Sequence, residues 1–255
     1  MEHIIETNNL SIAFGGHVAV DSLSVKIPKN KFTSVIGPNG AGKTTFFNLL
    51  SGQLRPTNGE IFYKGENITK KSSTERTRMG IGRSFQITNV FPNLTVLENV
   101  RLAVQSNEKI RYQMMFHFKK YKKFEEKAME LLELVLLETK ADSVAINLAH
   151  GEKRKLEIAM LLALETDLLL LDEPTAGMSL EEVPAILEVI KKIKEKGDRT
   201  IVLIEHKMDM ILDLSDQVMV LFNGQLLAQD SPSEIMENKT VQSAYLGGLH
   251  DENSA

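Results

Sequence analysis

Residues 37–45 place glycines, a lysine and two threonines at a spacing that suits the binding of phosphate groups. The run is Gly37, Pro38, Asn39, Gly40, Ala41, Gly42, Lys43, Thr44 and Thr45, and it contains the pattern G-x-x-x-x-G-K-T. Glycines let consecutive backbone N–H groups turn inward and form a concave anion nest. Lys43 would add a point charge for the β- and γ-phosphates, and the Thr44 hydroxyl would be a ligand for Mg²⁺. The pattern predicts a nucleoside triphosphate site, but it does not by itself separate an ATPase from a GTPase or a kinase.

The segments on either side of this run are those that such a site needs. The β-branched and apolar run Phe32–Ile36 predicts a buried strand before it. Apolar residues at helical spacing from Phe46 to Leu50 predict a helix after it, ending near Gly52. The N-terminus of that helix would add a partial positive charge. The alternative is a glycine-rich turn without a ligand, but residues of these types at these offsets arise by chance in only about one chain in a hundred of this length.

Two acidic residues and a histidine follow later apolar runs. Asp172 and Glu173 come directly after residues 168–171, whose lack of alternation predicts a buried parallel strand. Open α/β sheets bind ligands at the carboxyl ends of their strands. We therefore expect Asp172 to serve Mg²⁺ and Glu173 to polarise an attacking water. His206 follows the predicted strand 200–205; a single histidine is more often structural, but at this edge it would contact the γ-phosphate or orient the water.

Phe14 is an aromatic residue at the end of the first predicted strand. The alternation over residues 4–28, with a turn at Gly15-Gly16, predicts a β-hairpin or a small antiparallel sheet. The Phe14 ring would either stack on a nucleotide base or belong to the core, and on the residue type alone the core is the more frequent place.

Residues 109–124, KIRYQMMFHFKKYKKF, differ in composition from the rest of the chain. Seven of these residues are Lys, Arg or His and five are aromatic. A basic, aromatic-rich amphipathic stretch can bind a membrane surface or a partner protein. It can equally be a solvated helix face whose aromatic rings pack on the layer beneath, and the sequence supports both interpretations.

Composition limits the function classes. The chain has 255 residues, a formal net charge of −4 and no cysteine. This length suits one large domain or one domain with an inserted lobe. The charge provides no basic field for nucleic acid, and the lack of cysteine excludes disulfides, thiolate metal sites and a cysteine nucleophile. The apolar runs are too short to span a membrane, and MEHIIETNNL lacks the pattern of a secretion signal. We therefore expect a soluble chain without a leader.

The remaining segments alternate between helical and strand patterns. Thr95 and Glu98 form a predicted capping box, and Asn223-Gly224 predicts a type I′ hairpin turn. The expected helices are 73–79, 95–105, 125–138, a helix opening at Gly151, 180–196, 207–214 and a short helix opening at Ser231; the expected strands are 60–63, 81–86, 217–222 and 225–229.

Taken in order, these motifs resemble those of the nucleotide-binding subunit of an ABC transporter over nearly the whole chain. GPNGAGKT resembles its Walker A motif, Gln86 its Q-loop glutamine, and the run Leu148, Ala149, His150, Gly151 and Glu152 its LSGGQ-type signature. LLLLDEP resembles Walker B followed by the catalytic Glu173, residues 176–179 (AGMS) the D-loop, and His206 the switch histidine. Phe14 takes the place of the A-loop aromatic, which favours base stacking.

The resemblance implies an α/β fold of the P-loop NTPase (RecA-like) type. Its mixed sheet would be joined by an N-terminal antiparallel β subdomain and an inserted α-helical subdomain. A single ABC ATPase domain would cover residues 1–255, with the core in residues 1–86 and 166–255 and the helical subdomain in residues 87–165. The implied cofactors are ATP and Mg²⁺, the metal being served by Thr44, Gln86 and Asp172.

The resemblance also implies partners. In this family two ATPase subunits close head to tail over two ATP molecules, so that each ATP meets Walker A of one chain and the signature of the other. A helix N-terminus at Gly151 agrees with this, because a second anion site has no use within one chain. The expected partners are a second ATPase subunit, identical or paralogous, two integral-membrane permease subunits whose coupling helix enters a groove of the helical subdomain, and indirectly a substrate-binding protein. The chain would then lie peripherally on the cytoplasmic face of the membrane.

The signature and the D-loop depart from the family pattern. Ala149 replaces the usual signature serine, His150 the following glycine, and Ser179 the usual D-loop aspartate. The hydroxyl contact to the partner's γ-phosphate is therefore missing, whereas backbone N–H groups near Gly151 remain and His150 is a candidate donor. Ser179 in turn leaves the communication between the two ATP sites open.

The departures also indicate a branch of the family. Together with IGRSFQ, DEPTAGMS, IEHKMDM and AYLGG, they are most similar to the longer ATPase subunit of branched-chain amino-acid importers. Urea and short-amide importers share much of this pattern, and a soluble ABC module without a permease is a further alternative. A GTPase is disfavoured because no N-K-x-D motif occurs.

Overall fold

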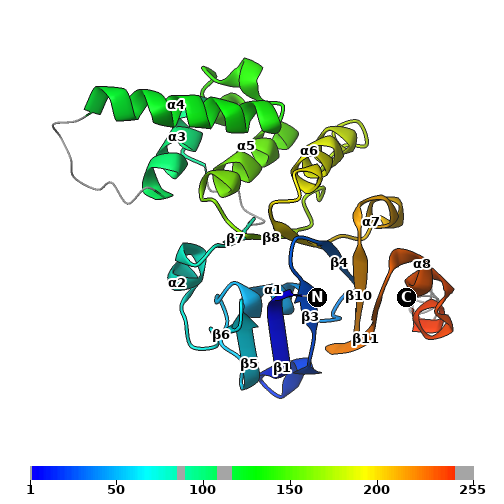
Figure 1. Ribbon diagram of the computed structural model, residues 1–255. Coiled ribbons are helices and arrows are strands. Elements are labelled where there is room, and N and C mark those ends of the chain that lie inside the picture. Colours follow the sequence, from blue (N-terminus) through cyan, green and yellow to red (C-terminus); the bar gives the residue numbers. More distant parts are fainter. Residues whose placement is uncertain (1, 85–89, 108–116, 245–255) are drawn as a thin grey trace.

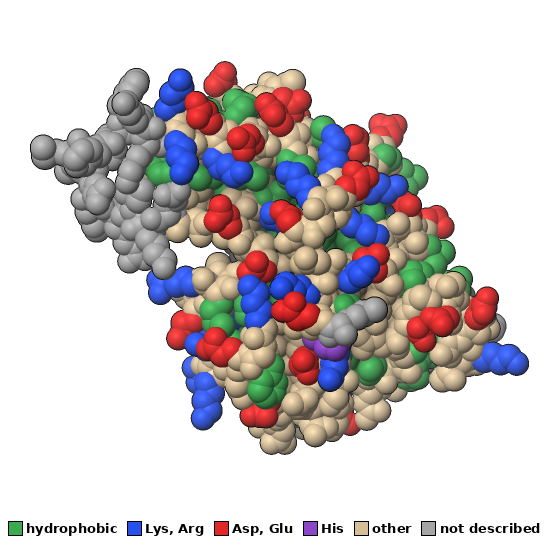
Figure 2. Space-filling view, viewed as in Figure 1, with side chains coloured by type: hydrophobic (Ala, Val, Ile, Leu, Met, Phe, Trp, Pro, Cys, Tyr) green, Lys and Arg blue, Asp and Glu red, His purple; other side chains and the backbone are tan. Residues whose placement is uncertain are grey.

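The computed structural model describes residues 2–84, 90–107 and 117–244, and it contains two sheets and a group of packed helices (Figure 1). None of the described helices is both long and apolar enough to cross a membrane. On the face shown in Figure 2, the Lys and Arg side chains of the described residues are interspersed with Asp and Glu side chains.

The larger sheet has six strands among the described residues, in the order β11-β10-β4-β9-β8-β7. The strands are β4 (Phe32–Ile36), β7 (Ile81–Arg83), β8 (Leu168–Asp172), β9 (Thr200–Ile204), β10 (Gln217–Phe222) and β11 (Gln225–Asp230). All neighbouring pairs are parallel except β10 and β11. Strands β4, β8 and β9 are buried at every position, which explains their continuous apolar or β-branched runs.

The second sheet is antiparallel and comes from the first part of the chain. Its strands are β1 (His3–Phe14), β2 (His17–Leu23), β3 (Lys26–Pro28), β5 (Asn58–Tyr63) and β6 (Glu66–Asn67). The order is β2-β1-β5-β6, and β3 also pairs with β1. Gly15 and Gly16 turn β1 into β2 with φ angles of 53° and 92°. The predicted antiparallel sheet is therefore confirmed.

Alternate residues of the central strands face two cores. In β8, Leu169 and Leu171 pack with helices α3 to α6, whereas Leu168 and Leu170 pack with α1 and the antiparallel sheet. The helices are α1 (Lys43–Leu50), α2 (Ser73–Arg78), α3 (Val96–Asn107), α4 (His117–Leu134), α5 (His150–Ala163), α6 (Val183–Glu195), α7 (Met208–Leu214) and α8 (Pro232–Glu237), with 3₁₀ turns at Glu138–Lys140 and Ala145–Asn147. Figure 1 shows α3, α4 and α5 gathered on one side of the large sheet, away from β1, β5 and β6.

Arg76 fixes the C-terminal end of α1, the helix that follows the glycine-rich run. The side chain is fully buried, and its guanidinium donates to the carbonyls of Leu49 and Leu50 at 2.6 and 2.9 Å. It also donates to the carbonyls of Ile68, Thr69 and Lys71. Burial lowers the pKa of Arg76 to about 10, so the group stays charged at neutral pH. One cation thus satisfies orphan helix carbonyls and a neighbouring turn together.

Some predicted boundaries were wrong. Helix α4 begins at His117 and ends at Leu134, not over 125–138, because Leu136 takes a left-handed φ of 57°. Helix α6 begins at Val183 rather than 180, with Pro184 in its first turn. Strand β7 ends at Arg83, and residues 85 and 86 of the predicted strand lie outside the described residues. The Asn223-Gly224 turn is confirmed, with φ angles of 48° and 77°.

Candidate functional site

The run 37–45 forms a loop between β4 and α1 that only glycine permits at its critical points. Gly40 and Gly42 have φ angles of 78° and 94°. A Cβ on Gly42 would lie 2.4 Å from the Ala19 carbonyl oxygen, and one on Gly37 would lie 2.2 Å from that of Leu221. Gly42 is the N-cap of α1, so the N–H groups of the first helical turn stay available at the loop.

The side chain of Lys43 folds back and binds the backbone of this loop. Its Nζ atom donates to the carbonyls of Gly37 at 2.7 Å and Pro38 at 3.0 Å. Burial lowers the pKa of Lys43, while the nearby charges of Glu173 and Asp172 oppose this effect. The lysine therefore joins the loop electrostatically to the acidic residues at the end of β8.

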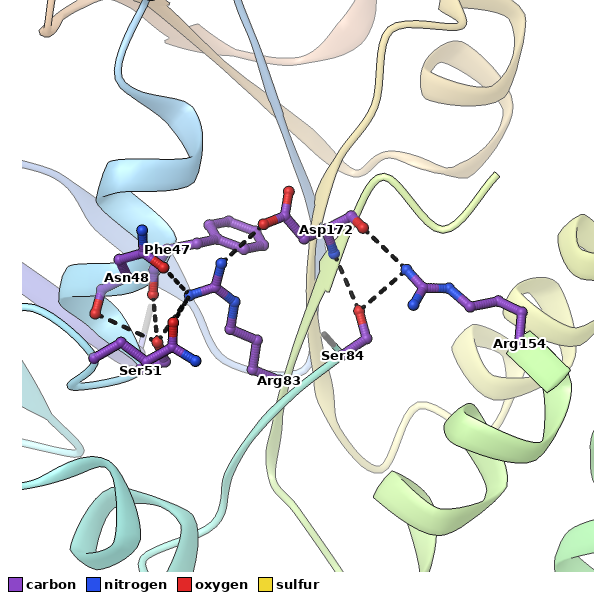
Figure 3. A network of polar contacts seen from close by, with 8 residues as sticks. Phe47, Asn48, Ser51, Arg83, Ser84, Arg154 and Asp172 are labelled. Carbon is purple, nitrogen blue, oxygen red and sulfur yellow. Dashed lines mark hydrogen bonds and ion pairs between the residues drawn. The ribbon is translucent and has the colours of Figure 1, made fainter. Parts of the chain in front are cut away.

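Asp172 is the centre of a buried polar network at the end of β8 (Figure 3). Its Oδ2 atom accepts from Arg83 Nη2 at 2.9 Å, and its backbone N–H donates to Ser84 Oγ at 3.2 Å. Its backbone carbonyl accepts from Arg154 Nη2 at 3.0 Å. Since Arg154 belongs to α5, the network joins that helix directly to the strand that carries Asp172.

Arg83 connects the same carboxylate to α1. Its Nη1 atom donates to Asn48 Oδ1 at 2.6 Å and to Ser51 Oγ at 3.0 Å, as Figure 3 shows. Sequence reasoning missed Arg83 and Arg154. The one available signal for Arg83 was a cation at the end of a predicted strand, at the edge where an acidic pair was also expected.

Asp172 has the properties of a partner for a hard cation. The residue is 2 % exposed, and its Oδ1 atom has no hydrogen-bond partner among the described residues. Burial raises the pKa of Asp172, and the charge of Arg83 opposes this. The described residues hold no group of three His, Cys, Asp or Glu side chains that would bind a metal ion alone. This donor set fits Mg²⁺, which usually keeps waters and phosphate oxygens as its other ligands. Gln86, the other predicted metal residue, lies outside the described residues.

Glu173 and His206 are brought together from the ends of β8 and β9. Glu173 Oε1 lies 3.0 Å from His206 Nε2. Glu173 has a φ angle of 44°, unusual for a residue with a side chain, and its N–H donates to the Ile204 carbonyl at 3.0 Å. A carboxylate and an imidazole at this distance form a pair suited to the handling of one proton.

Glu205 positions the backbone of this pair. Its side chain is 3 % exposed, its Oε2 atom accepts from the His206 N–H at 2.9 Å, and its Oε1 atom accepts from the Thr175 hydroxyl. Sequence reasoning missed Glu205, because a glutamate at the end of a predicted strand gives no sign that its carboxylate turns inward.

The signature residues form the start of α5. Ala149 is the N-cap, and its N–H donates to Glu152 Oε2 at 3.0 Å. Leu148 is buried, whereas His150 is exposed. The Gly151 N–H donates to Glu182 Oε1 at 3.2 Å. Helix α5 thus begins near Gly151 as predicted.

Phe14 lies at the end of β1 with 47 % of its surface exposed. The core interpretation of this ring is therefore wrong. Base stacking stays a prediction that an exposed ring beside the first hairpin turn permits.

A mainly apolar cavity of about 400 Å³ lies between α3 and α5 and extends to Arg83 and Ser84. It is lined by Arg83, Ser84, Phe91, Leu102, Ala103, Ser106, Glu157, Met160, Leu161 and Leu164. Glu157 also accepts from Arg154 Nη1 at 2.8 Å, so the cavity shares its polar wall with the network around Asp172.

Comparison with known proteins identifies the family. The model of the ABC transporter family matches residues 20–176. The probable branched-chain amino acid transport ATP-binding protein LivG of Archaeoglobus fulgidus is 36% identical over 251 residues, covering 98% of this chain and 97% of that protein. The high-affinity branched-chain amino acid transport ATP-binding protein LivG of Salmonella typhimurium is 36% identical over 251 residues, covering 96% and 98%.

Solved structures agree with this result. The ADP conformation of MJ1267, an ATP-binding cassette of an ABC transporter, matches with a TM-score of 0.80 and 28% identity over 97% of this chain and 100% of that chain. The dimeric structure of MJ0796, a bacterial ABC transporter cassette, matches with a TM-score of 0.75 and 26% identity over 89% and 98%. The fold and family predicted from the motifs are confirmed. The chain therefore belongs to the ABC transporter family, as a LivG-like ATP-binding subunit that hydrolyses ATP.

Proposed function

We propose that this ATPase powers the import of branched-chain amino acids, by closing with a second ATPase subunit on a membrane permease. The observation that carries the proposal is that the Glu173–His206 pair follows directly on Asp172, whose carboxylate is joined through Arg83 to α1, the helix that begins at Lys43. The match to LivG proteins over nearly the whole chain supports the substrate class.

ATP binding would use the loop and the exposed aromatic ring. Phe14 would stack on the base, and the N–H groups of residues 37–45 with Lys43 would hold the phosphates. Thr44, Asp172 and Gln86 would serve Mg²⁺, which supplies charge neutralisation between the β- and γ-phosphates when bound. The unpaired Asp172 Oδ1 supports this assignment.

Glu173 would accept the proton of the attacking water, and His206 would contact and hold the γ-phosphate. Their contact at 3.0 Å keeps both side chains in position before ATP arrives. In phosphoryl transfer, positioning and electrostatic stabilisation supply most of the rate, and both depend on fixed side chains. The bonds from Glu205 to the His206 N–H and to Thr175 support such fixation.

The second ATPase subunit, identical or paralogous, would complete each site. Residues 148–152 would face the ATP of the partner chain, through the N–H groups at the start of α5. We propose the domain division 1–86 and 166–255 for the core and 87–165 for the helical subdomain, because α3, α4 and α5 pack mainly against one another.

The cavity between α3 and α5 would receive a coupling helix from one of the two permease subunits. Its lining is mainly apolar, and Phe91 at its rim is 53 % exposed. Such a surface suits the apolar face of a short helix. The chain would then lie on the cytoplasmic face of the membrane, and a substrate-binding protein would act on it only through the permease.

A direct test combines affinity purification from membranes with uptake of radiolabelled substrates. We expect the chain to co-purify with integral-membrane subunits, and leucine uptake to disappear in cells whose only copy is Glu173→Gln. Loss of urea uptake with normal leucine uptake would favour a urea importer. Recovery without any membrane protein would favour a soluble ABC module.

A further inference from the structure

Glu182 joins the signature to the segment 176–179 through one carboxylate. Its Oε1 atom accepts from the Gly151 N–H at 3.2 Å, and its Oε2 atom accepts from the N–H and the hydroxyl of Ser179 at 3.1 and 3.2 Å. Hydrogen bonds from the backbone lower the pKa of Glu182; the bond from the Ser179 N–H has the larger effect and the bond from the Gly151 N–H the next. An anion of the chain itself therefore sits at the start of α5.

The donor that Glu182 takes is one of the few that the signature retains. Ala149 has no hydroxyl group, and its N–H already donates to Glu152 at 3.0 Å. The N-terminus of the 14-residue helix α5 attracts anions through its N–H groups and its dipole. In this chain the Ala149 and Gly151 N–H groups donate to two carboxylates, those of Glu152 and Glu182.

The contact with Gly151 is close. A Cβ built on Gly151 would lie 3.2 Å from Glu182 Oε1 and 3.6 Å from Glu182 Cβ. The Glu182 side chain thus covers the approach to the Gly151 N–H. A phosphate oxygen cannot accept from this N–H while the carboxylate stays there.

We propose that Glu182 competes with the partner's ATP for the Gly151 N–H, and that closure of the dimer requires its release. This inference rests on the proposed function, in which the signature meets the ATP of the second subunit. Two anions at one donor repel each other, so the carboxylate opposes closure until it moves away. Because the same carboxylate holds Ser179, its release also frees the D-loop. Occupancy of one ATP site is thereby linked to the segment that follows Glu173.

The test measures ATP-driven dimerisation in a chain that cannot hydrolyse ATP. The parent carries Glu173→Gln, and the test variants add Glu182→Gln, which removes the charge, or Glu182→Ala, which removes the contact. The control adds Glu181→Gln at the exposed neighbouring position. The mass in solution is recorded against ATP concentration without Mg²⁺.

We expect both Glu182 variants to dimerise at an ATP concentration about tenfold lower than the parent, since a nearby like charge is removed. The Glu181→Gln control should match the parent. If Glu182 only holds the signature in shape, both variants will dimerise less readily than the parent, and this result would overturn the proposal. An unchanged ATP dependence would overturn it as well.

The outcome for the parent separates this inference from the proposed function. If the parent dimerises, the proposed closure holds and the Glu182 variants alone decide the competition. If the parent binds ATP but stays monomeric, dimerisation of a Glu182 variant would support the proposed competition. If the Glu182 variants stay monomeric as well, Glu182 is not what prevents closure, and the proposal is overturned. Failure to bind ATP would contradict the proposed function itself.

Discussion

Glu173 is the residue on which the proposed chemistry depends most. Replacing it by Gln keeps the shape and the contact with His206 but removes the base, so we expect ATP to bind normally while hydrolysis falls by about 100-fold or more. Steady-state phosphate release and fluorescent-nucleotide binding measure the two effects. Glu181→Gln is the control, and hydrolysis near the normal rate in Glu173→Gln would exclude Glu173 as the base.

Substitution of Glu205 tests whether its contacts position His206 beside Glu173. In Glu205→Gln the amide offers only one acceptor oxygen, whereas the native carboxylate accepts from both the His206 N–H and the Thr175 hydroxyl. We expect His206 to lose its fixed position and hydrolysis to fall about tenfold, with ATP affinity unchanged. Thr175→Val should have a smaller effect in the same direction. Normal hydrolysis in a folded Glu205→Gln protein would remove Glu205 from this function.

At the scale of elements, Arg76 ties α1 to the turn before α2. Arg76→Met keeps the apolar stem but removes the guanidinium that donates to the buried Leu49 and Leu50 carbonyls at the end of α1. We expect the free energy of unfolding to fall by about 3 kcal/mol. Urea unfolding followed by circular dichroism measures this loss. The exposed Arg78→Met is the matched control, and equal stability of the two variants would show that Arg76 contributes no more than a surface residue.

The elements that depend on local pattern were predictable from the sequence. Strand β4, helix α1 and the hairpin at Asn223-Gly224 follow from apolar runs, glycine positions and turn residues, which act within a few positions. The C-terminal end of α4 and the start of α6 were not predicted, since a left-handed Leu136 and a turn before Val183 carry no strong local signal.

The contacts that support the site residues could not be predicted from the sequence, for a different reason. Arg83 and Asp172 are 89 positions apart, and Gly151 and Glu182 are 31 apart. Such pairs depend on the order of strands in the sheet, which no short motif encodes. The residues of the recognised motifs carried the prediction, whereas the residues that position them, such as Arg83, did not.

At the scale of the whole molecule, the basic stretch 109–124 has two open interpretations. Residues 109–116 lie outside the described residues, while Tyr121 Oη donates to Glu98 Oε1 at 2.8 Å and Phe124 is buried. These two contacts agree with aromatic packing on the layer beneath.

Charge reversal separates these interpretations. We expect Glu in place of Lys119, Lys120, Lys122 and Lys123 to leave the ATPase activity of the isolated chain unchanged and to weaken association with the membrane or the permease. Co-sedimentation with membranes measures the effect, and reversal of the exposed Lys31, Lys196 and Lys239 is the control. An unchanged sedimentation profile would show that the stretch is a solvated helix face.

The claim that ATP closes a pair of these chains is tested most directly by the mass of the Glu173→Gln protein in solution, with and without Mg²⁺-free ATP. We expect a monomer of 28.5 kDa without ATP and a species of twice that mass with ATP. This shift would show that Ala149 and His150 still form a working signature. A chain that binds ATP and stays at 28.5 kDa would contradict self-pairing and would direct the search to a paralogous second ATPase subunit.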